Sequence, residues 1–273
     1  MVNPAIRSLG RQALEPIEFT IEIFFMLYLS ARAVVQDPSQ GLRSIFSVVL
    51  TQIYFTGVQA LPLISVLAVA SGSIVILQAS MNIGLLGGAG AIGGVMVAVI
   101  VREIAPLLTA LIVIARSGTA VASDIGTMKV NREIEALEAM GIHPLSYVVF
   151  PRLLGGVISV VCLAIYFVLI AVVGGYVVTN FIQSLPLSFY ADSLARAFSR
   201  QDVGLFLLKN LFSGIIIFVV SCHQGLQVKQ SPHEVPQVTT KAVVTSIIYV
   251  VVFNMAVTIL FYLARLMDLG LKL

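Results

Sequence analysis

Apolar runs of about 20 residues recur along this chain, and they restrict its fold more than any other feature. They cover roughly residues 45–78, 84–114, 147–180, 203–221 and 242–264. A helix needs about 20 residues to cross the roughly 30 Å of hydrocarbon in a bilayer. Barrel strands would alternate apolar and polar residues, whereas these runs are continuous. The sequence therefore predicts an all-α integral membrane protein with five transmembrane helices.

The composition agrees with a membrane protein and disfavours two other classes. Of 273 residues, 59% are hydrophobic and 11% are charged, whereas soluble domains carry about 25% charged residues. The formal net charge is +3, but the basic residues are spread over segment ends, so we expect no nucleic-acid partner. The two cysteines and three histidines lack ligand spacing, and we expect no metal site.

Residues 1–41 precede the first run and have a different pattern. Five charged residues repeat every three or four positions and share one face of a helix: Arg7, Arg11, Glu15, Glu18 and Glu22. One charged stripe on an otherwise apolar helix predicts an interfacial helix that lies along the membrane. The alternative is a tilted first crossing. We expect residues 1–273 to form one domain, with the transmembrane region over 45–264.

Glycine and proline mark helix kinks and close approaches. Pro62 predicts a kink in the first crossing. Gly84 and Gly88, like Gly90 and Gly94, are four residues apart, a pattern typical of helix packing in membranes. A phosphate-binding loop is disfavoured because no Lys-Ser/Thr follows. In the third run, close approaches are expected at the pairs Gly155-Gly156 and Gly174-Gly175.

Glu103 lies inside the second apolar run, next to Arg102. A charge at that depth costs free energy and normally faces a protein interior or a wet cavity. Glu103 is therefore a candidate functional residue. The alternative is a structural ion pair with Arg102 or with another helix.

A short charged helix is predicted between the second and third crossings. Asn131 is a candidate N-cap, and Gly141 followed by Pro144 is a typical helix stop. Val130, Ile134, Leu137 and Gly141 would share one face, and the remaining positions carry Arg132, Glu133, Glu135 and Glu138. Such a helix either forms a solvated loop or docks a partner.

The distribution of basic residues predicts the orientation. With the amino end cytoplasmic, ten basic residues fall inside and four outside, as expected if basic loops stay inside. The short helix at 130–140 is then cytoplasmic and the carboxyl end is extracytoplasmic. On the outer side, Asp192 and Arg196 predict a surface helix with an i,i+4 ion pair.

Enzyme motifs are missing from the sequence. There is no GxSxG and no Walker motif, so we expect no enzyme activity and no cofactor in this chain, with any ATP bound by a partner. An intramembrane enzyme built on Glu103 is the disfavoured alternative.

The central stretch carries a family resemblance. REIAPLLTALIVIARSGTAVASDIGTMKVNREIEALEAMGIHPLSYVVFPR resembles the signature of MlaE (YrbE) permeases, the membrane subunits of lipid-transporting ABC systems. The segments VQALPLISVLAVASGSIVILQ and VTTKAVVTS are similar to other parts of that family. The sequence departs from the family at Ile104-Ala105, in the loop SPHEVPQVTTK, and at Asn254, where an acidic residue is frequent.

The resemblance implies an assembly. It implies an interfacial helix plus five transmembrane helices, arranged as a homodimer in the bacterial inner membrane. The implied partners are two cytoplasmic ABC ATPase subunits, an extracytoplasmic MCE-domain lipid carrier and, in some systems, a STAS-domain protein. The implied task is phospholipid transport linked to outer-membrane lipid asymmetry.

The resemblance also implies roles for residues. The coupling helix that contacts the ATPase would comprise Val130, Arg132, Glu133, Ile134, Leu137, Glu138 and Met140. We expect a lipid cavity between two copies, lined by Val66, Val69, Ser73, Val75, Leu77, Glu103, Lys209 and Asn254. Two alternatives are a stand-alone secondary transporter or channel, and a scaffold for the MCE protein.

Overall fold

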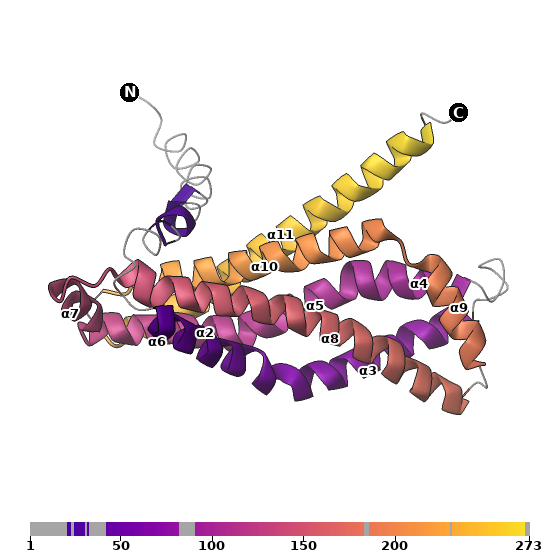
Figure 1. Cartoon of the computed structure of the whole chain (residues 1–273), viewed down its shortest axis with the longest axis horizontal. Coiled ribbons are helices and arrows are strands. Elements are labelled where there is room, and N and C mark those ends of the chain that lie inside the picture. The colour runs from indigo at the N-terminus through magenta and orange to yellow at the C-terminus, as the bar shows by residue number, and fades with distance from the viewer. Residues whose placement is uncertain are drawn as a thin grey trace, which may run out of the picture.

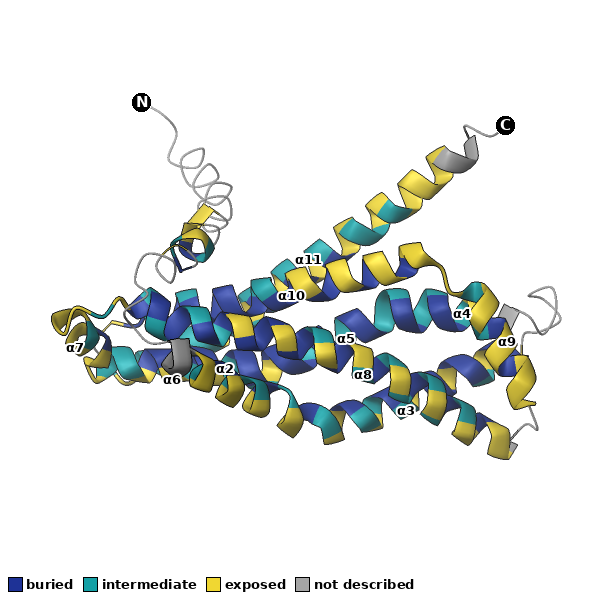
Figure 2. Ribbon diagram, viewed as in Figure 1, coloured by how far each residue is buried: buried dark blue, intermediate teal, exposed yellow. Residues whose placement is uncertain are grey.

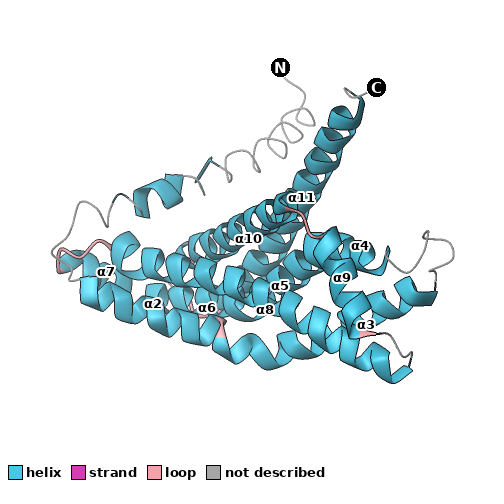
Figure 3. Cartoon of the chain, turned by 45° about the vertical axis from the view of Figure 1, so that its right-hand side comes forward, coloured by secondary structure: helices cyan, strands magenta, loops and turns pink. Residues whose placement is uncertain are grey.

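The computed structural model describes residues 21–22, 25–30, 32, 42–81, 91–182, 186–229 and 231–270. Every regular element in these ranges is helical (Figure 3). Five helical segments are long and apolar enough to cross a membrane: Phe46–Met81, Ile92–Val130, Leu145–Phe181, Arg200–Leu226 and Glu234–Met267. The predicted all-α membrane fold with five crossings is confirmed.

The first crossing is broken near its middle. It consists of α2 (Leu42–Thr56), the short 3₁₀ turn η2 (Val58–Ala60) and α3 (Leu61–Met81). Pro62 has no N–H to donate, and such a residue is tolerated only in the first turn of a helix. The helix therefore restarts at Leu61, and the predicted kink near Pro62 is confirmed.

The second crossing alternates α-helical and wider π-helical turns. It contains α4 (Ala91–Met96), η3 (Val97–Ile104), α5 (Ala105–Val113), η4 (Ile114–Gly118) and α6 (Thr119–Val130). Pro106, in the first turn of α5, cannot donate to the carbonyl of Arg102 four residues earlier. That carbonyl instead accepts a hydrogen bond from Lys209 on another helix. The π-helical turns thus contain the charged residues of this crossing: Arg102 and Glu103 lie in η3, and Arg116 lies in η4.

The remaining elements complete the bundle. They are α7 (Glu133–Ala139), η5 (Leu145–Val149), α8 (Phe150–Ile182), α9 (Leu187–Ala197), α10 (Arg200–Leu226) and α11 (Glu234–Gly270). Figure 1 shows α7 at one end of the bundle and α4 with α9 at the other. The predicted surface helix is α9, and its Asp192–Arg196 pair is confirmed at 2.6 Å.

The helices α3 and α8 approach each other closely at glycine residues. A Cβ added at Gly72 would lie 2.1 Å from the carbonyl oxygen of Ala171, and one at Gly175 would lie 2.7 Å from the backbone of Gly72. Cβ atoms at Gly155 and Gly156 would also clash, at 2.9 and 2.3 Å. The predicted close approaches in the third crossing are therefore confirmed. A Cβ would meet the backbone of a neighbouring helix at Gly155 and Gly175, the Val69 side chain at Gly174 and the Phe218 ring at Gly156.

The four glycines predicted to pack helices at the start of the second crossing are not confirmed. Gly84, Gly88 and Gly90 lie outside the described residues. A Cβ at Gly94 would meet nothing within 4 Å, whereas one at Gly93 would lie 2.2 Å from the carbonyl oxygen of Ser193. Within the chain, the packing glycine is thus Gly93 and not the predicted Gly94, because the adjacent position faces α9.

The helix α11 leaves the bundle along its second half (Figure 2). Only 11% of its most apolar stretch is buried. Its exposed side chains include Val252, Met255, Leu260 and Leu266. This face is apolar because it meets lipid or another protein rather than water.

Candidate functional site

Charged side chains from two crossings meet a threonine of a third inside the bundle. Lys209 on α10 is fully buried, and its Nζ lies 3.0 Å from Glu103 Oε2 on η3. The same ammonium donates to the Arg102 carbonyl oxygen at 2.7 Å and to Thr258 Oγ1 of α11 at 2.8 Å. A buried ammonium needs such partners, since an unpaired charge in a low-dielectric interior is very costly. The three contacts use all three of its N–H groups.

Glu103 therefore forms an ion pair with another helix. A structural ion pair was one of the two interpretations of this residue in the sequence. Its side chain remains 42% exposed although its partner is buried. Thr258 Oγ1 lies 3.1 Å from each of its carboxylate oxygens. The carboxylate thus has one side bound to Lys209 and another side accessible. This arrangement can hold the ion pair and still present negative charge at the surface of the bundle.

Arg102 does not pair with its neighbour Glu103. Its Nε donates to Asp202 Oδ1 at 2.8 Å, and Asp202 is almost completely buried. The guanidinium carbon also lies 5.5 Å from the ring centroid of Phe261, within reach of a cation–π contact. Asp202 in addition accepts from the backbone N–H of Ser199 and completes a capping box at the start of α10. The two adjacent charges therefore bind two different residues of the same helix, α10.

Two residues of this network were missed by sequence reasoning. Asp202 stands three residues after Ser199, the spacing of a capping box before an apolar run, and that signal was available in the sequence. Thr258 carries no comparable signal. It lies one helical turn after Asn254, whose backbone carbonyl accepts from its hydroxyl at 2.9 Å.

Asn254 lies near this network, but its side chain bonds to residues other than Lys209. Its Nδ2 donates to Ser213 Oγ at 3.0 Å and to the Val250 carbonyl at 2.9 Å. Its Oδ1 is buried and has no hydrogen-bond partner among the described residues. The amide thus joins α11 to α10, while Thr258 occupies the position next to the lysine.

Three of the residues predicted to line a lipid cavity border a shallow apolar groove instead. Val66, Val69 and Ser73 line it on α3, together with Val178 of α8. Val75 does not line it and is buried in the core, and Leu77 is half-buried outside the groove. Each residue turns the helix by about 100°, so positions 75 and 77 point elsewhere. Glu103, Lys209 and Asn254 are also absent from its lining, so one protomer does not join the two regions.

The predicted coupling helix exists as α7, with a different start. The second crossing continues as α6 up to Val130, and the chain then reverses within Asn131 and Arg132. Arg132 adopts a left-handed conformation with φ 60°. Asn131 does not cap the helix, and its Nδ2 instead donates to Glu133 Oε1 at 3.1 Å. The predicted N-cap is wrong because α6 continues to Val130, which makes Asn131 its C-cap and leaves Arg132 at the start of α7.

The predicted stop of this helix is confirmed. Gly141 has φ 77° and donates to the Glu138 carbonyl at 2.9 Å, while Ile142 donates to the Leu137 carbonyl at 2.9 Å. These two bonds form a Schellman motif. They fix the C-terminal end of α7 at the tip of the bundle.

The burial of α7 shows which face is free. Ile134 is 3% exposed and Leu137 is half-buried, so both pack on this chain. Arg132, Glu133, Glu138 and Met140 are exposed, and Val130 is half-buried. Met140 has 66% of its surface accessible. The surface that α7 offers to a partner is therefore acidic with one large apolar side chain.

Metal-ligating side chains do not cluster in the described part of the chain. No three His, Cys, Asp or Glu residues there stand close enough to hold an ion. The N-terminal charged stripe falls mostly outside the described residues. Its last member, Glu22, contacts His223 of α10 at 3.1 Å.

Comparisons with known proteins agree with these features. The family described as Permease MlaE matches residues 49–260. A probable ABC transporter permease protein of Rickettsia conorii is 32% identical over 255 residues, which covers 93% of this chain and 96% of the relative. One from Synechocystis is 29% identical and covers 81% of this chain and 82% of the relative.

A plant protein is also similar. The chloroplastic protein Trigalactosyldiacylglycerol 1 of Arabidopsis thaliana is 26% identical over 171 residues, covering 63% of this chain and 49% of the relative. The match to Permease MlaE spans all five crossings and includes α7, Glu103, Lys209 and Thr258. This chain belongs to the MlaE permease family.

Proposed function

We propose that the protein is the membrane subunit of an ABC transporter that moves phospholipid between the bacterial inner membrane and an extracytoplasmic MCE-domain carrier. The observation that carries this proposal is α7, a short helix held at the tip of the bundle with its acidic face free. The bacterial relatives are named probable ABC transporter permeases. A separate cytoplasmic ATPase would bind the ATP and contact α7, and some systems would add a STAS-domain protein.

Phospholipid is the proposed cargo because the exposed surface suits acyl chains. The groove on α3 is lined almost entirely by apolar atoms and opens outward. The name of the Arabidopsis relative refers to a galactolipid. A phospholipid would lay its tails along this groove.

Two copies are proposed to act together. The exposed apolar face of α11 and the open groove on α3 both lack cover within one protomer. A homodimer would enclose the groove near the accessible side of Glu103. ATP binding in the partner would move α7 and change the width of this space, as coupled two-state elements do.

Co-purification with an ABC ATPase tests the coupling role. Met140→Asp places a charge on the free face of α7, and we expect loss of the ATPase from the purified complex. Ile134→Asp would be a poor test because Ile134 is buried within the chain and its replacement would disturb the fold.

The matched control is Leu187→Asp, which changes an equally exposed apolar residue on α9 at the other end of the bundle. This variant should retain the ATPase. Retention of the ATPase by Met140→Asp would contradict the proposed coupling. Substrate flux through the purified chain without any ATPase would instead support the alternative of a secondary transporter or channel.

A further inference from the structure

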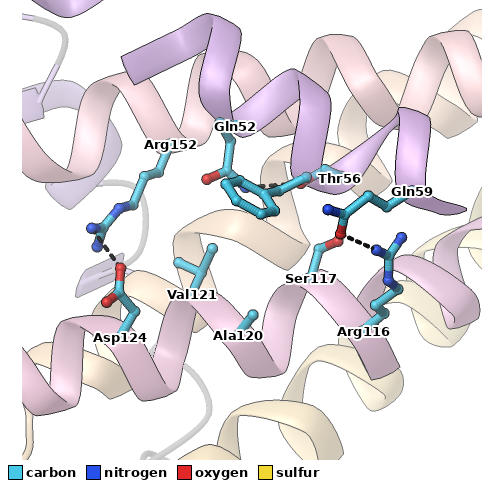
Figure 4. A pocket seen from close by; sticks show the side chains of 10 residues that line it. Gln52, Thr56, Gln59, Arg116, Ser117, Ala120, Val121, Asp124 and Arg152 are labelled. Atoms are coloured by element: carbon cyan, nitrogen blue, oxygen red, sulfur yellow. Dashed lines mark hydrogen bonds and ion pairs between the residues drawn. The ribbon is translucent and has the colours of Figure 1, made fainter. Parts of the chain in front are cut away.

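A polar pocket lies between α2, α6 and α8, and its charged groups bond within the chain (Figure 4). Arg116 Nη2 donates to Gln59 Oε1 at 2.6 Å at one end of the pocket, and Arg152 Nη2 lies 2.7 Å from Asp124 Oδ2 at the other end. Each guanidinium thus joins two segments of the bundle. A pocket nearer the α9 end has a different character.

The pocket near α9 is lined by apolar side chains alone. Its volume is about 260 Å³. Its walls come from the second crossing, from α8 and from α9, and they include Val97, Val101, Val168, Val172, Leu194 and Phe198. It shares no lining residue with the groove on α3, and neither Glu103 nor Lys209 borders it.

Water does not suit this space. A buried water needs two to four polar partners, and an apolar cavity of about 150 Å³ is large enough to bind benzene while it stays dry. A void of this size would also be costly if it were empty, because protein interiors contain few voids larger than a water molecule. The occupant should therefore be an apolar group.

The helix α10 locates the lipid headgroups near the pocket. Its 27 residues form one crossing and span about 40 Å at 1.5 Å per residue, which matches a bilayer with its headgroup regions. Arg200, the first residue of α10, therefore lies among the headgroups of the leaflet at the α9 end.

The pocket lies just below that level. The second crossing runs beside α10 in the same direction, and Ala122 lies against Gly225. The same offset along the two helices places Val97 about level with Arg200, and Val101 about one turn deeper. The pocket therefore lies where the acyl chains of that leaflet begin, and an acyl chain is the apolar group available there.

A cation lies beside the accessible side of the pocket. Phe198 lines the pocket and is 48% exposed. Phe198 and Ser199 are both extended, with φ of −80° and −108°. Alternate side chains of an extended segment point to the same side, so Arg200 lies on the side of Phe198. Arg200 is exposed and takes part in no ion pair with another described residue, so it can bind a phosphate there.

We propose that this pocket binds one acyl chain of a membrane phospholipid from the leaflet at the α9 end, with the phosphate of that lipid against Arg200. The apolar walls accept the chain, and the arginine supplies the charge that the phosphate complements. The site is separate from the groove on α3 and does not depend on the proposed transport. A lipid bound there would join α9 to the second crossing and to α8.

Tryptophan fluorescence tests the site, because the chain contains no tryptophan of its own. Phe198→Trp replaces one aromatic lining residue by another. The probe is phosphatidylglycerol with brominated acyl chains, since bromine quenches tryptophan on contact. Titration of the full-length protein in detergent should give saturable quenching. The matched control is Phe189→Trp, on the same helix outside the pocket, and its quenching should not saturate.

Variants that fill the pocket test the location of the chain. Val172→Phe, combined with Phe198→Trp, occupies the pocket from α8 and should abolish the saturable quenching. Val173→Phe makes the same change at the next residue, which is 61% exposed and lies outside the pocket, and it should leave the quenching intact. If Val172→Phe fails to fold in a thermal unfolding assay, Ala195→Phe fills the pocket from α9 instead.

The phosphate contact is tested separately. Arg200→Gln should weaken the binding of the phospholipid by about twofold to fivefold at low salt, as for an exposed ion pair, and the difference should shrink at high salt. Brominated diacylglycerol, which has the same chains without the phosphate, should bind the unchanged arginine protein as weakly as the phospholipid binds Arg200→Gln.

Three results would overturn the proposal. They are equal quenching in Phe198→Trp and Phe189→Trp, saturable quenching that persists when the pocket is filled, and equal affinity for the phospholipid and the diacylglycerol. The first two would show that the lipid lies outside the pocket, and the third would leave Arg200 without a role.

Discussion

Lys209 and Glu103, 106 residues apart in the sequence, form an ion pair at 3.0 Å in which the lysine is fully buried and the carboxylate is 42% exposed. The pair joins η3 to α10, and Thr258 connects both residues to α11. Glu103 thus has a structural role in one protomer and an accessible side for a second role. The two roles can be separated by measurement.

Glu103→Gln should destabilise the protein, because it leaves the buried Lys209 charge without a counter-ion. Since the carboxylate is partly solvated, we expect a loss of about 1–3 kcal/mol in the free energy of unfolding. Thermal unfolding in detergent measures this loss. Asp192→Asn, which breaks an exposed pair, is the control and should cost about 0–1 kcal/mol.

The double variant Glu103→Gln, Lys209→Met should recover most of the stability, because it removes both charges and keeps an apolar chain of similar length. If the recovered protein still transports lipid poorly, the accessible side of Glu103 serves transport. A double variant as unstable as the single one would contradict the ion-pair account.

The same substitution should have opposite effects at two glycines. Gly72→Ala places a Cβ against the Ala171 carbonyl and should cost about 1–3 kcal/mol through overpacking between α3 and α8. Gly94→Ala meets nothing within 4 Å and should stabilise its helix by up to about 1 kcal/mol. Thermal unfolding of the two variants checks the signs, and destabilisation by both would show that α4 packs on something outside the protomer.

Cysteine labelling can determine which end of the bundle faces the cytoplasm. In a Cys162→Ala, Cys222→Ala background, Ala139→Cys marks α7 and Leu187→Cys marks α9, and both native residues are exposed. A membrane-impermeant thiol reagent added to spheroplasts should label only Leu187→Cys. Labelling of Ala139→Cys before permeabilisation would reverse the proposed orientation.

The sequence was sufficient to predict the features that depend on local pattern. The length of the apolar runs predicted five crossings, and Pro62 predicted the break before α3. Gly141 predicted the end of α7, because a left-handed residue is needed there and glycine adopts that conformation without strain. These features involve residues within a few positions of one another.

Features that depend on helix rotation and long-range contact were not predictable in the same way. An amphipathic pattern identified the apolar face of α7 but not whether Ile134 packs on this chain or on a partner, and it packs on this chain. Gly93 and Gly94 are equivalent in sequence, yet one faces α9 and the other faces away. The partner of Glu103 depended on how α10 and α11 pack against η3.

ATP-dependent transfer of phospholipid from proteoliposomes to an MCE-domain carrier tests the central claim most directly. The chain reconstituted with its ATPase should transfer labelled phospholipid only when ATP is hydrolysed, and Met140→Asp should abolish this transfer while the protein still inserts. Transfer at the same rate without the ATPase, or unchanged transfer by Met140→Asp, would contradict the account.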